Sequence, residues 1–230
     1  MTKETALERE MLVDKDTGIS ALSRRKFLGF AGAASGIVLL ASSCKKDDNN
    51  DGVNLGSGDV GILNYAYALE QLEAAFYIQV IATPFSGITA TERIFLTDIR
   101  DHEIAHREFF KNALGGNAIP ALEVDFSTIN FSSRDSVLGT AKAFEDLGVS
   151  AYDGAGYLIK DANYLLLAGK IVSVEARHAA TIRELISPNS FLGDSVDANS
   201  VNVARTPAEV LTIAGPYIKT KINASNLPTG

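Results

Sequence analysis

The chain is poor in several residue types on which common scaffolds and sites depend. Its 230 residues include no tryptophan, three histidines and one cysteine, Cys44, so an intramolecular disulfide is excluded. The net charge of −7 makes nucleic acid an unfavourable partner. The apolar run Phe27 to Ala41 covers only about 15 residues, which is short for a helix that spans a bilayer. The length suffices for one domain of ordinary size.

The first 43 residues are typical of an export signal rather than of folded structure. Ser23 to Leu28 reads S-R-R-K-F-L and stands directly before the apolar run. This pattern resembles a twin-arginine export signal, and a basic flank beside a weak membrane anchor is the alternative. Leu40 to Cys44 reads L-A-S-S-C and resembles a bacterial lipobox, in which the cysteine is lipidated after cleavage. We therefore expect an exported protein, held in the cell envelope by a lipid on Cys44.

Composition divides the remaining chain into three parts. Residues 44–58 are polar, contain glycine and lack an apolar period, so we expect a flexible tether. Residues 59–186 carry a helical period and predict a four-helix bundle. Residues 187–230 form a C-terminal extension, in which Thr206 and Pro207 predict a short helix. The residues of that helix expected to pack on the bundle are Val210, Leu211 and Ile213.

Start and stop signals bound the four helical segments. Thr89 and Glu92 form a capping-box pattern, and glycine or proline follows the ends of the first two segments. Residues 117–133 separate the second helix from the third and show no helical period, which predicts a long crossover between opposite ends of the bundle. The fold class is therefore all-α. The expected helices run from Asp59 to Pro84, from Thr89 to Leu114, from Ser132 or Ser133 to about Ile159, and from Asp161 to Pro188. Asp59 and Asp161 are the expected N-terminal caps of the first and fourth helices.

Two of the three histidines follow a glutamate at the same spacing. Glu103-Ile104-Ala105-His106 and Glu175-Ala176-Arg177-His178 are both E-x-x-H. Positions i and i+3 of a helix lie on one face, so each motif directs a carboxylate oxygen and an imidazole nitrogen to the same point. Two such helices can together hold two metal ions.

An internal repeat adds a lone glutamate to each motif. The segment A-L-E-Q-L around Glu70 aligns with A-F-E-D-L around Glu145. Each half of the bundle is then a helix with one inward glutamate, followed by a helix with an inward E-x-x-H. The alignment selects Glu70 rather than Glu73, because Gly148 matches Glu73. We expect Glu73 beside the ligands or at the surface.

Two tyrosines follow the lone glutamates at equal spacing. Tyr77 and Tyr152 lie seven positions, about two turns, beyond Glu70 and Glu145, on the same helix faces. Tyrosines in this place are commonly part of the apolar core. The functional interpretation is a phenol that forms hydrogen bonds or takes part in redox chemistry close to the metals.

Four carboxylates in one apolar core, with two imidazoles beside them, require a compensating positive charge. Burial of an unpaired carboxylate is costly, and neighbouring carboxylates repel one another. Two divalent cations would balance four carboxylates, with neutral histidines completing the coordination. One glutamate from each of two helices plus E-x-x-H from each of the other two is the ligand set of ferritin-like dimetal bundles. The predicted ligands are Glu103 and Glu175 as bridges, Glu70 and Glu145 as terminal carboxylates, and His106 and His178.

Longer phrases carry a narrower resemblance. Leu63 to Ala66 (L-N-Y-A), Leu69 to Tyr77 (L-E-Q-L-E-A-A-F-Y) and Thr206 to Leu211 (T-P-A-E-V-L) are similar to the ferritin-like domain family that includes desiccation-related proteins. The resemblance covers about residues 58–218. It implies a ferritin-like fold, the six ligands named above, and oxidation of iron or of a substrate by oxygen or peroxide. The tether and the C-terminal extension depart from the closed shells of storage ferritins.

The favoured interpretation is a di-iron carboxylate protein whose substrates are Fe(II), oxygen or peroxide. Manganese is the alternative metal, with a dimanganese catalase-like reaction. A non-catalytic envelope protein stabilised by metal is a second alternative. A third follows from His102, since His102 to His106 matches the zinc-protease motif H-E-x-x-H. The expected partners are a membrane, through the lipid anchor, and small inorganic substrates. The sequence is also compatible with a homo-oligomer.

Overall fold

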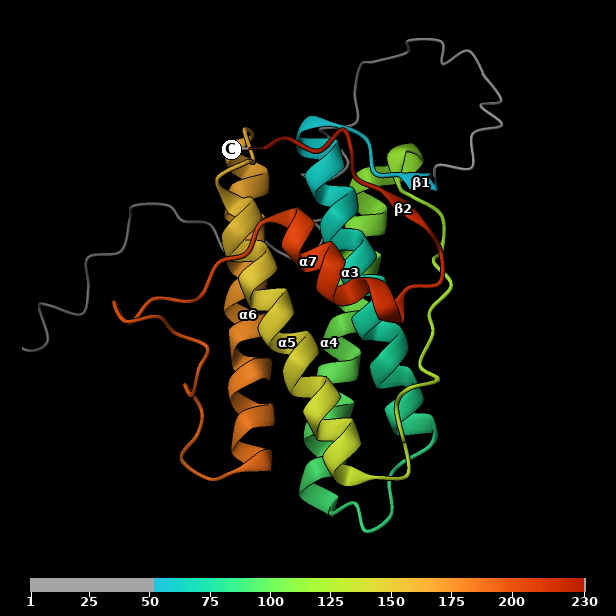
Figure 1. Ribbon diagram of the computed structural model, residues 1–230, viewed down its shortest axis with the longest axis vertical. Coiled ribbons are helices and arrows are strands. Elements are labelled where there is room, and N and C mark those ends of the chain that lie inside the picture. Colours follow the sequence, from blue (N-terminus) through green and yellow to red (C-terminus); the bar gives the residue numbers. More distant parts are fainter. Residues whose placement is uncertain (1–51, 230) are drawn as a thin grey trace, which may run out of the picture. The chain divides into compact units, whose positions relative to one another are not determined.

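The computed structural model describes residues 52–229, so the expected export signal and Cys44 lie outside the described residues. Four long helices form a bundle, as predicted for an all-α protein, with a crossover between the second and third (Figure 1). None of the helices in this part of the chain combines the length and apolarity needed to cross a bilayer. The bundle helices are α3 (Gly58–Ala82), α4 (Ala90–Leu114), α5 (Arg134–Gly156) and α6 (Ala162–Ile186).

Local side-chain bonds set where three of these helices begin. The Thr89 hydroxyl accepts the Glu92 N–H at 3.2 Å, and the Glu92 carboxylate accepts the Thr89 N–H at 2.8 Å, which forms the predicted capping box of α4. The side chains of Ser133 and Asp161 cap α5 and α6 in the same manner. Each cap therefore satisfies one of the N–H groups that the first turn of its helix leaves unpaired.

Asp59 does not cap the first helix as predicted. Its two carboxylate oxygens instead accept the N–H groups of Lys160 and Asp161, at 2.9 and 2.8 Å. Ser57 occupies the cap position of α3 and forms no side-chain capping bond. Asp59 therefore ties the start of α3 to the turn between α5 and α6, a contact between residues far apart in sequence.

The crossover runs along the bundle from the end of α4 to the start of α5 (Figure 1). Two amide side chains of α3 hold it. Asn64 donates to the Asn117 carbonyl at 2.9 Å and accepts the Ile119 N–H at 2.9 Å. Gln71 accepts the Leu122 N–H at 2.8 Å. These bonds satisfy backbone groups that an irregular segment would otherwise leave unpaired.

Both ends of the described chain are joined in a small parallel sheet. Strand β1 (Val53–Asn54) pairs with β2 (Ile222–Asn223), and Leu55 is fully buried. The last residues of the predicted tether therefore belong to the fold. The polar composition of this segment does not predict a strand, because β1 pairs with a strand near the other end of the described chain.

Helix α7 (Pro207–Ala214) follows Thr206 as predicted and packs against α5, beside which it is drawn in Figure 1. Val210 is fully buried and Leu211 packs partly on the core. Ile213 is 45% exposed, so the expectation that it packs on the bundle was wrong. Two short 3-10 helices, η1 (Gly115–Asn117) and η2 (Gly215–Tyr217), complete the secondary structure of the described residues.

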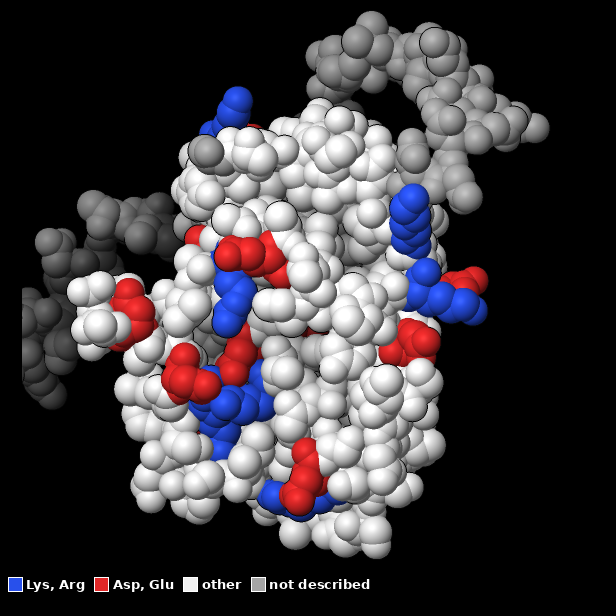
Figure 2. Space-filling view, in the orientation of Figure 1, with Lys and Arg blue, Asp and Glu red and all other residues white. Residues whose placement is uncertain are grey.

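Acidic and basic side chains lie next to one another on the face drawn in Figure 2. Arg183 is an example of how such charges are paired in this fold, since its guanidinium donates to Asp146 at 2.7 Å and to Asp194 at 2.9 Å. These two contacts of Arg183 join α6 to α5 and to the C-terminal extension. Burial of the Arg183 side chain is tolerated because two carboxylates face it.

Gly154 lies where the backbone of the extension packs closely on α5. A Cβ atom at this position would lie within 2.5 Å of the Arg205 carbonyl carbon. We expect Gly154→Ala to lower the free energy of unfolding by about 3 kcal/mol, the upper end of the usual cost of overpacking. Urea denaturation measures the change.

The matched control is Gly139→Ala in the same helix, where a Cβ atom meets nothing within 4 Å. Alanine is the better helix former, so this variant should gain about 0.5–1 kcal/mol. Equal effects of the two substitutions would contradict the close packing of residue 205 on α5.

Candidate metal centre

The bundle brings all six predicted ligand residues to one level of its core. Each of α3 and α5 contributes one glutamate, and each of α4 and α6 contributes a glutamate and a histidine. Glu103, Glu145 and Glu175 are 0% exposed. The side chains group into two clusters that could each hold a metal ion. The first cluster is Glu70, Glu103, His106 and Glu175, and the second is Glu103, Glu145, Glu175 and His178.

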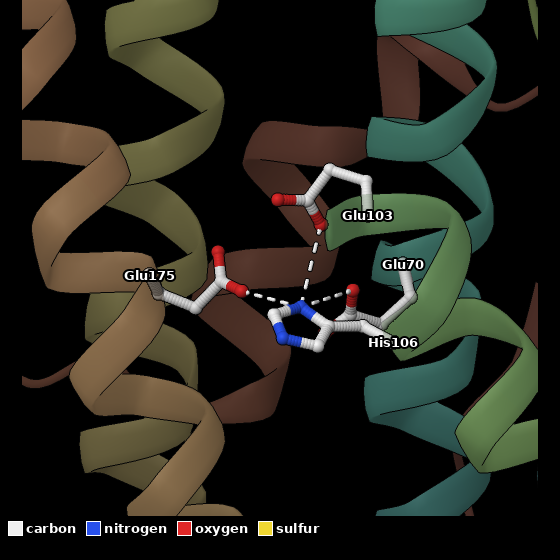
Figure 3. Close-up of side chains that lie close together, drawn as sticks. All are labelled: Glu70, Glu103, His106 and Glu175. Carbon is white, nitrogen blue, oxygen red and sulfur yellow. Dashed lines mark ion pairs between the residues drawn. The ribbon is translucent and has the colours of Figure 1, made fainter. Parts of the chain in front are cut away.

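The first cluster is arranged around His106 (Figure 3). The His106 Nδ1 atom lies 2.8 Å from Glu175 Oε1, 3.5 Å from Glu70 Oε2 and 3.7 Å from Glu103 Oε2. The three carboxylates come from three different helices. A cation near Nδ1 would therefore be held from α3, α4 and α6 at once.

The second cluster repeats this geometry around His178. Its Nδ1 atom lies 2.8 Å from Glu103 Oε1, 3.4 Å from Glu145 Oε2 and 3.8 Å from Glu175 Oε2. Glu103 and Glu175 each turn one oxygen to His106 and the other to His178. This is the geometry that a bridging carboxylate requires.

The two lone glutamates are held by tyrosines from the opposite half of the repeat. The Tyr77 hydroxyl donates to Glu145 Oε1 at 2.5 Å, and the Tyr152 hydroxyl donates to Glu70 Oε1. The other oxygen, Oε2, of each glutamate faces a histidine. Burial and the neighbouring carboxylate raise the pKa of both phenols well above 10, so the hydroxyls keep their protons. Each tyrosine thereby fixes which carboxylate oxygen is presented to the centre.

The polar atoms that face the centre lack hydrogen-bond partners. Eight buried side-chain atoms of the six residues form no hydrogen bond. Such atoms are rare in folded proteins, because an unsatisfied buried polar group costs about 1–3 kcal/mol. Oxygen and imidazole nitrogen are suitable donors for a divalent cation, so the residues fit a metal pair. The eight atoms are Glu70 Oε2, both Glu103 oxygens, His106 Nδ1, Glu145 Oε2, both Glu175 oxygens and His178 Nδ1.

Burial and mutual charge shift the protonation of this group. Burial, followed by the charge of Glu103, raises the pKa of Glu175 far above its usual range. Burial opposes ionisation of Glu103 too, but the neighbouring imidazoles of His106 and His178 outweigh it and lower the pKa of Glu103 to about 2. Burial lowers the pKa of His178, and the surrounding carboxylates more than reverse this and raise it to about 11. Without metal, protons therefore occupy the centre.

Glu73 is a fifth carboxyl group beside the centre. It is 3% exposed, and burial followed by the charges of Glu103 and Glu175 raises its pKa well above 4.5. A Cβ atom on Gly148 would lie 3.1 Å from Glu73 Oε1 and 3.6 Å from Glu175 Oε2. Gly148 is the residue that the repeat aligns with Glu73. Because Gly148 has no side chain, it leaves space for the carboxyl group of Glu73.

His102 lies outside both clusters. It is exposed, its Nδ1 atom is 2.9 Å from His178 Nε2, and the two rings stack with centroids 5.1 Å apart. This contact occupies the edge of His178 that faces away from the carboxylates. When Nε2 of His178 carries the hydrogen, Nδ1 keeps the lone pair that a metal requires. Its position on the helix, about 100° from Glu103, predicts a place beside the ligands or at the surface, and the structure adds the contact with His178 between α4 and α6.

The H-E-x-x-H interpretation requires His102 and His106 on one zinc ion. Neither cluster includes His102, whose Nδ1 atom meets His178 instead. The zinc-protease alternative also assigns no role to the buried Glu70, Glu145 and Glu175. The observed grouping therefore favours two clusters over a single zinc site.

These features define a ferritin-like four-helix bundle with two adjoining clusters able to hold metal. A family model described as the ferritin-like domain matches residues 58–188. The chain belongs to this family, and the matched segment includes all six predicted ligand residues. No curated protein matches the chain.

Metal binding should strengthen as the pH rises. The raised pKa values of His178 and Glu175 mean that an entering cation must displace protons, and protons compete less at higher pH. We expect the Kd for Mn(II) to fall about tenfold per pH unit for each proton displaced, between pH 6 and pH 8. Titration calorimetry in buffers of different ionisation enthalpy counts the protons. An affinity that does not depend on pH would show that the histidines are not ligands.

Proposed function

We propose that the protein is a dimetal carboxylate protein that oxidises Fe(II) with oxygen or peroxide. The observation that carries the proposal is the set of eight unpartnered buried atoms that face one another at the level of the E-x-x-H motifs. Two divalent cations would satisfy all eight and would balance the four carboxylates. Membership of the ferritin-like domain family supports the same conclusion.

The residues divide between two metal positions. One ion would bind to Glu70 and His106, the other to Glu145 and His178, and Glu103 and Glu175 would bridge the two. The opposed directions of the Glu103 and Glu175 oxygens support these bridges. Mixed carboxylate and imidazole donors suit iron and manganese, and iron is the metal we favour.

Iron would supply the redox chemistry of the site. Two Fe(II) ions give one electron each, and with two protons these reduce oxygen to hydrogen peroxide, or hydrogen peroxide to two waters. The chain contributes a buried environment with little room for bulk water. Tyr77 and Tyr152 keep the lone glutamates in position, and Glu73 holds a carboxyl group beside the centre. Burial and the charges of the neighbouring carboxylates raise the pKa of Glu73, which favours the protonated form of this carboxyl group when metal is absent.

Two other roles use the same ligand set. A dimanganese centre would support catalase-like breakdown of peroxide. A metal pair without turnover would stabilise the bundle, because its ligands come from all four helices and bound metal adds directly to folding stability. Metal identity and turnover decide between these roles.

The cellular setting that we propose rests on the sequence. The twin-arginine pattern and the lipobox precede the bundle, and Cys44 would carry the lipid. The bundle would then work in the cell envelope beside a membrane. Export of an already folded protein fits a metal centre loaded in the cytoplasm.

Metal content tests the proposed bridges. Protein purified without added metal should contain about two iron or manganese ions per chain by elemental mass spectrometry. Glu103→Gln should lose both ions, because Glu103 belongs to both clusters, whereas Glu145→Gln should retain about one. The control is Glu108→Gln on the same helix, a 43% exposed glutamate paired with Arg107, which should leave the content unchanged. Unchanged metal in Glu103→Gln would refute the assignment.

His102→Ala separates the dimetal centre from a zinc-protease site. Loss of the partner of His178 Nε2 should weaken binding by about tenfold and still leave about two ions at saturating metal. Equilibrium dialysis against graded Mn(II) measures both quantities. A single zinc ion that disappears in this variant would favour the protease instead.

A further inference from the structure

We propose that an apolar pocket on one side of the metal-ligand level binds dioxygen and leads it to the Glu70–His106 position. This inference rests on the proposed function for the identity of the oxidant. The pocket itself is a property of the metal-free chain, so it can be tested separately. It selects dioxygen, rather than peroxide, from the oxidants that the proposed function allows.

The pocket lies next to the ligands, toward the end of the bundle where α3 begins. All four helices line it. Its α3 residues and Ala151 of α5 are buried, whereas Ala113 on α4 and Tyr164 and Ala168 on α6 are partly exposed. It therefore opens between α4 and α6. The lining residues Ala66, Phe110 and Ile171 lie four positions, about one helical turn, from Glu70, His106 and Glu175 respectively.

The internal repeat shows why there is space on this side alone. The pocket residue Ala151 occupies the place that Phe76 holds in the other half. Phe76 is 0% exposed, and its ring packs 5.1 Å from Tyr77 and 5.2 Å from Phe144. In the same way the pocket residue Ala168 matches Leu96, which is also 0% exposed. Small residues on one side therefore leave a space that large residues fill on the other.

The size and lining of the pocket select a small uncharged molecule. The cavity volume is about 30 Å³. About 10–15 Å³ suffices for one water-sized molecule, so two bonded atoms of that size fit. The lining is built from aliphatic and aromatic side chains, so a water molecule in the pocket would find few hydrogen-bond partners. Hydrogen peroxide or a hydrated cation would lose hydrogen bonds to water on entry and find few replacements.

Tyr152 connects the pocket with the metal centre. Its ring lines the pocket and stacks against Phe110 with centroids 6.4 Å apart, while its hydroxyl donates to Glu70. A molecule in the pocket therefore rests against the residue that positions a ligand of the first cluster. The corresponding tyrosine, Tyr77, is 0% exposed and lies in the packed half. Dioxygen would thus approach the two metal positions unequally.

Xenon is a suitable probe, since it is an apolar gas that enters dry cavities. Under xenon pressure the metal-free protein should show saturable NMR shifts of the methyl groups of Ala151, Ala168 and Ile171. Ala168→Leu, which copies Leu96, should weaken xenon binding by about tenfold or more. Ala113→Leu, which copies Leu185, is a second filling variant on α4. Ala162→Leu is the matched control, since this residue of α6 is exposed and does not line the pocket.

Iron-loaded protein tests the route by stopped-flow absorbance. Ala168→Leu and Ala113→Leu should slow oxidation by dioxygen by about tenfold, in proportion to their loss of xenon binding, and should leave oxidation by hydrogen peroxide unchanged. Ala162→Leu should match the parent protein with both oxidants.

Absence of saturable xenon shifts in the parent protein would refute the claim that the pocket binds a small apolar molecule. If the filling variants lost xenon binding but oxidised iron with dioxygen at the parent rate, dioxygen would not reach the metal position through the pocket. A protein that binds xenon in the pocket but holds no metal would refute the proposed function and, with it, dioxygen as the occupant. The two failures are therefore distinguishable.

Discussion

Four carboxylates removed from water at one level of a helical bundle are the constraint on which the rest of the fold depends. Glu103, Glu145 and Glu175 are fully buried, and each is within reach of an imidazole from another helix or from the next turn. Such a group is stable only with compensating positive charge, supplied by protons or by metal. The two inward histidines meet this requirement in part, and the tyrosine bonds fix the lone glutamates beside them.

The sequence was sufficient for the helical part of the fold because each element carries its own signal. The capping box at Thr89 and Glu92 and the side-chain cap at Asp161 appear where the pattern predicted them. The lone glutamates could be chosen because the chain repeats itself, and the structure groups them with both E-x-x-H motifs. Their role as metal ligands stays a prediction that metal analysis must test.

The features that escaped prediction depend on partners distant in sequence. Asp59 reads as a helix cap, yet its oxygens bind the turn before α6. His102 reads as part of a zinc motif, yet it contacts His178 across the bundle. Leu55 lies in a polar stretch and is buried because a strand from the C-terminal extension covers its segment. Neither local propensity nor periodicity contains this information, since each contact is fixed only when the helices assemble.

The parallel pairing of β1 with β2 has a mechanical consequence. The Val53 and Leu55 N–H groups donate to the carbonyls of Lys221 and Asn223, so a pull on the preceding chain along the strand loads both bonds at once. Bonds loaded together in shear resist force better than bonds opened one after another. An anchor at Cys44 would transmit tension to the β1–β2 pair and to Leu55 before any tension reached the first turn of α3. The ligand geometry would thereby be insulated from movements of the membrane.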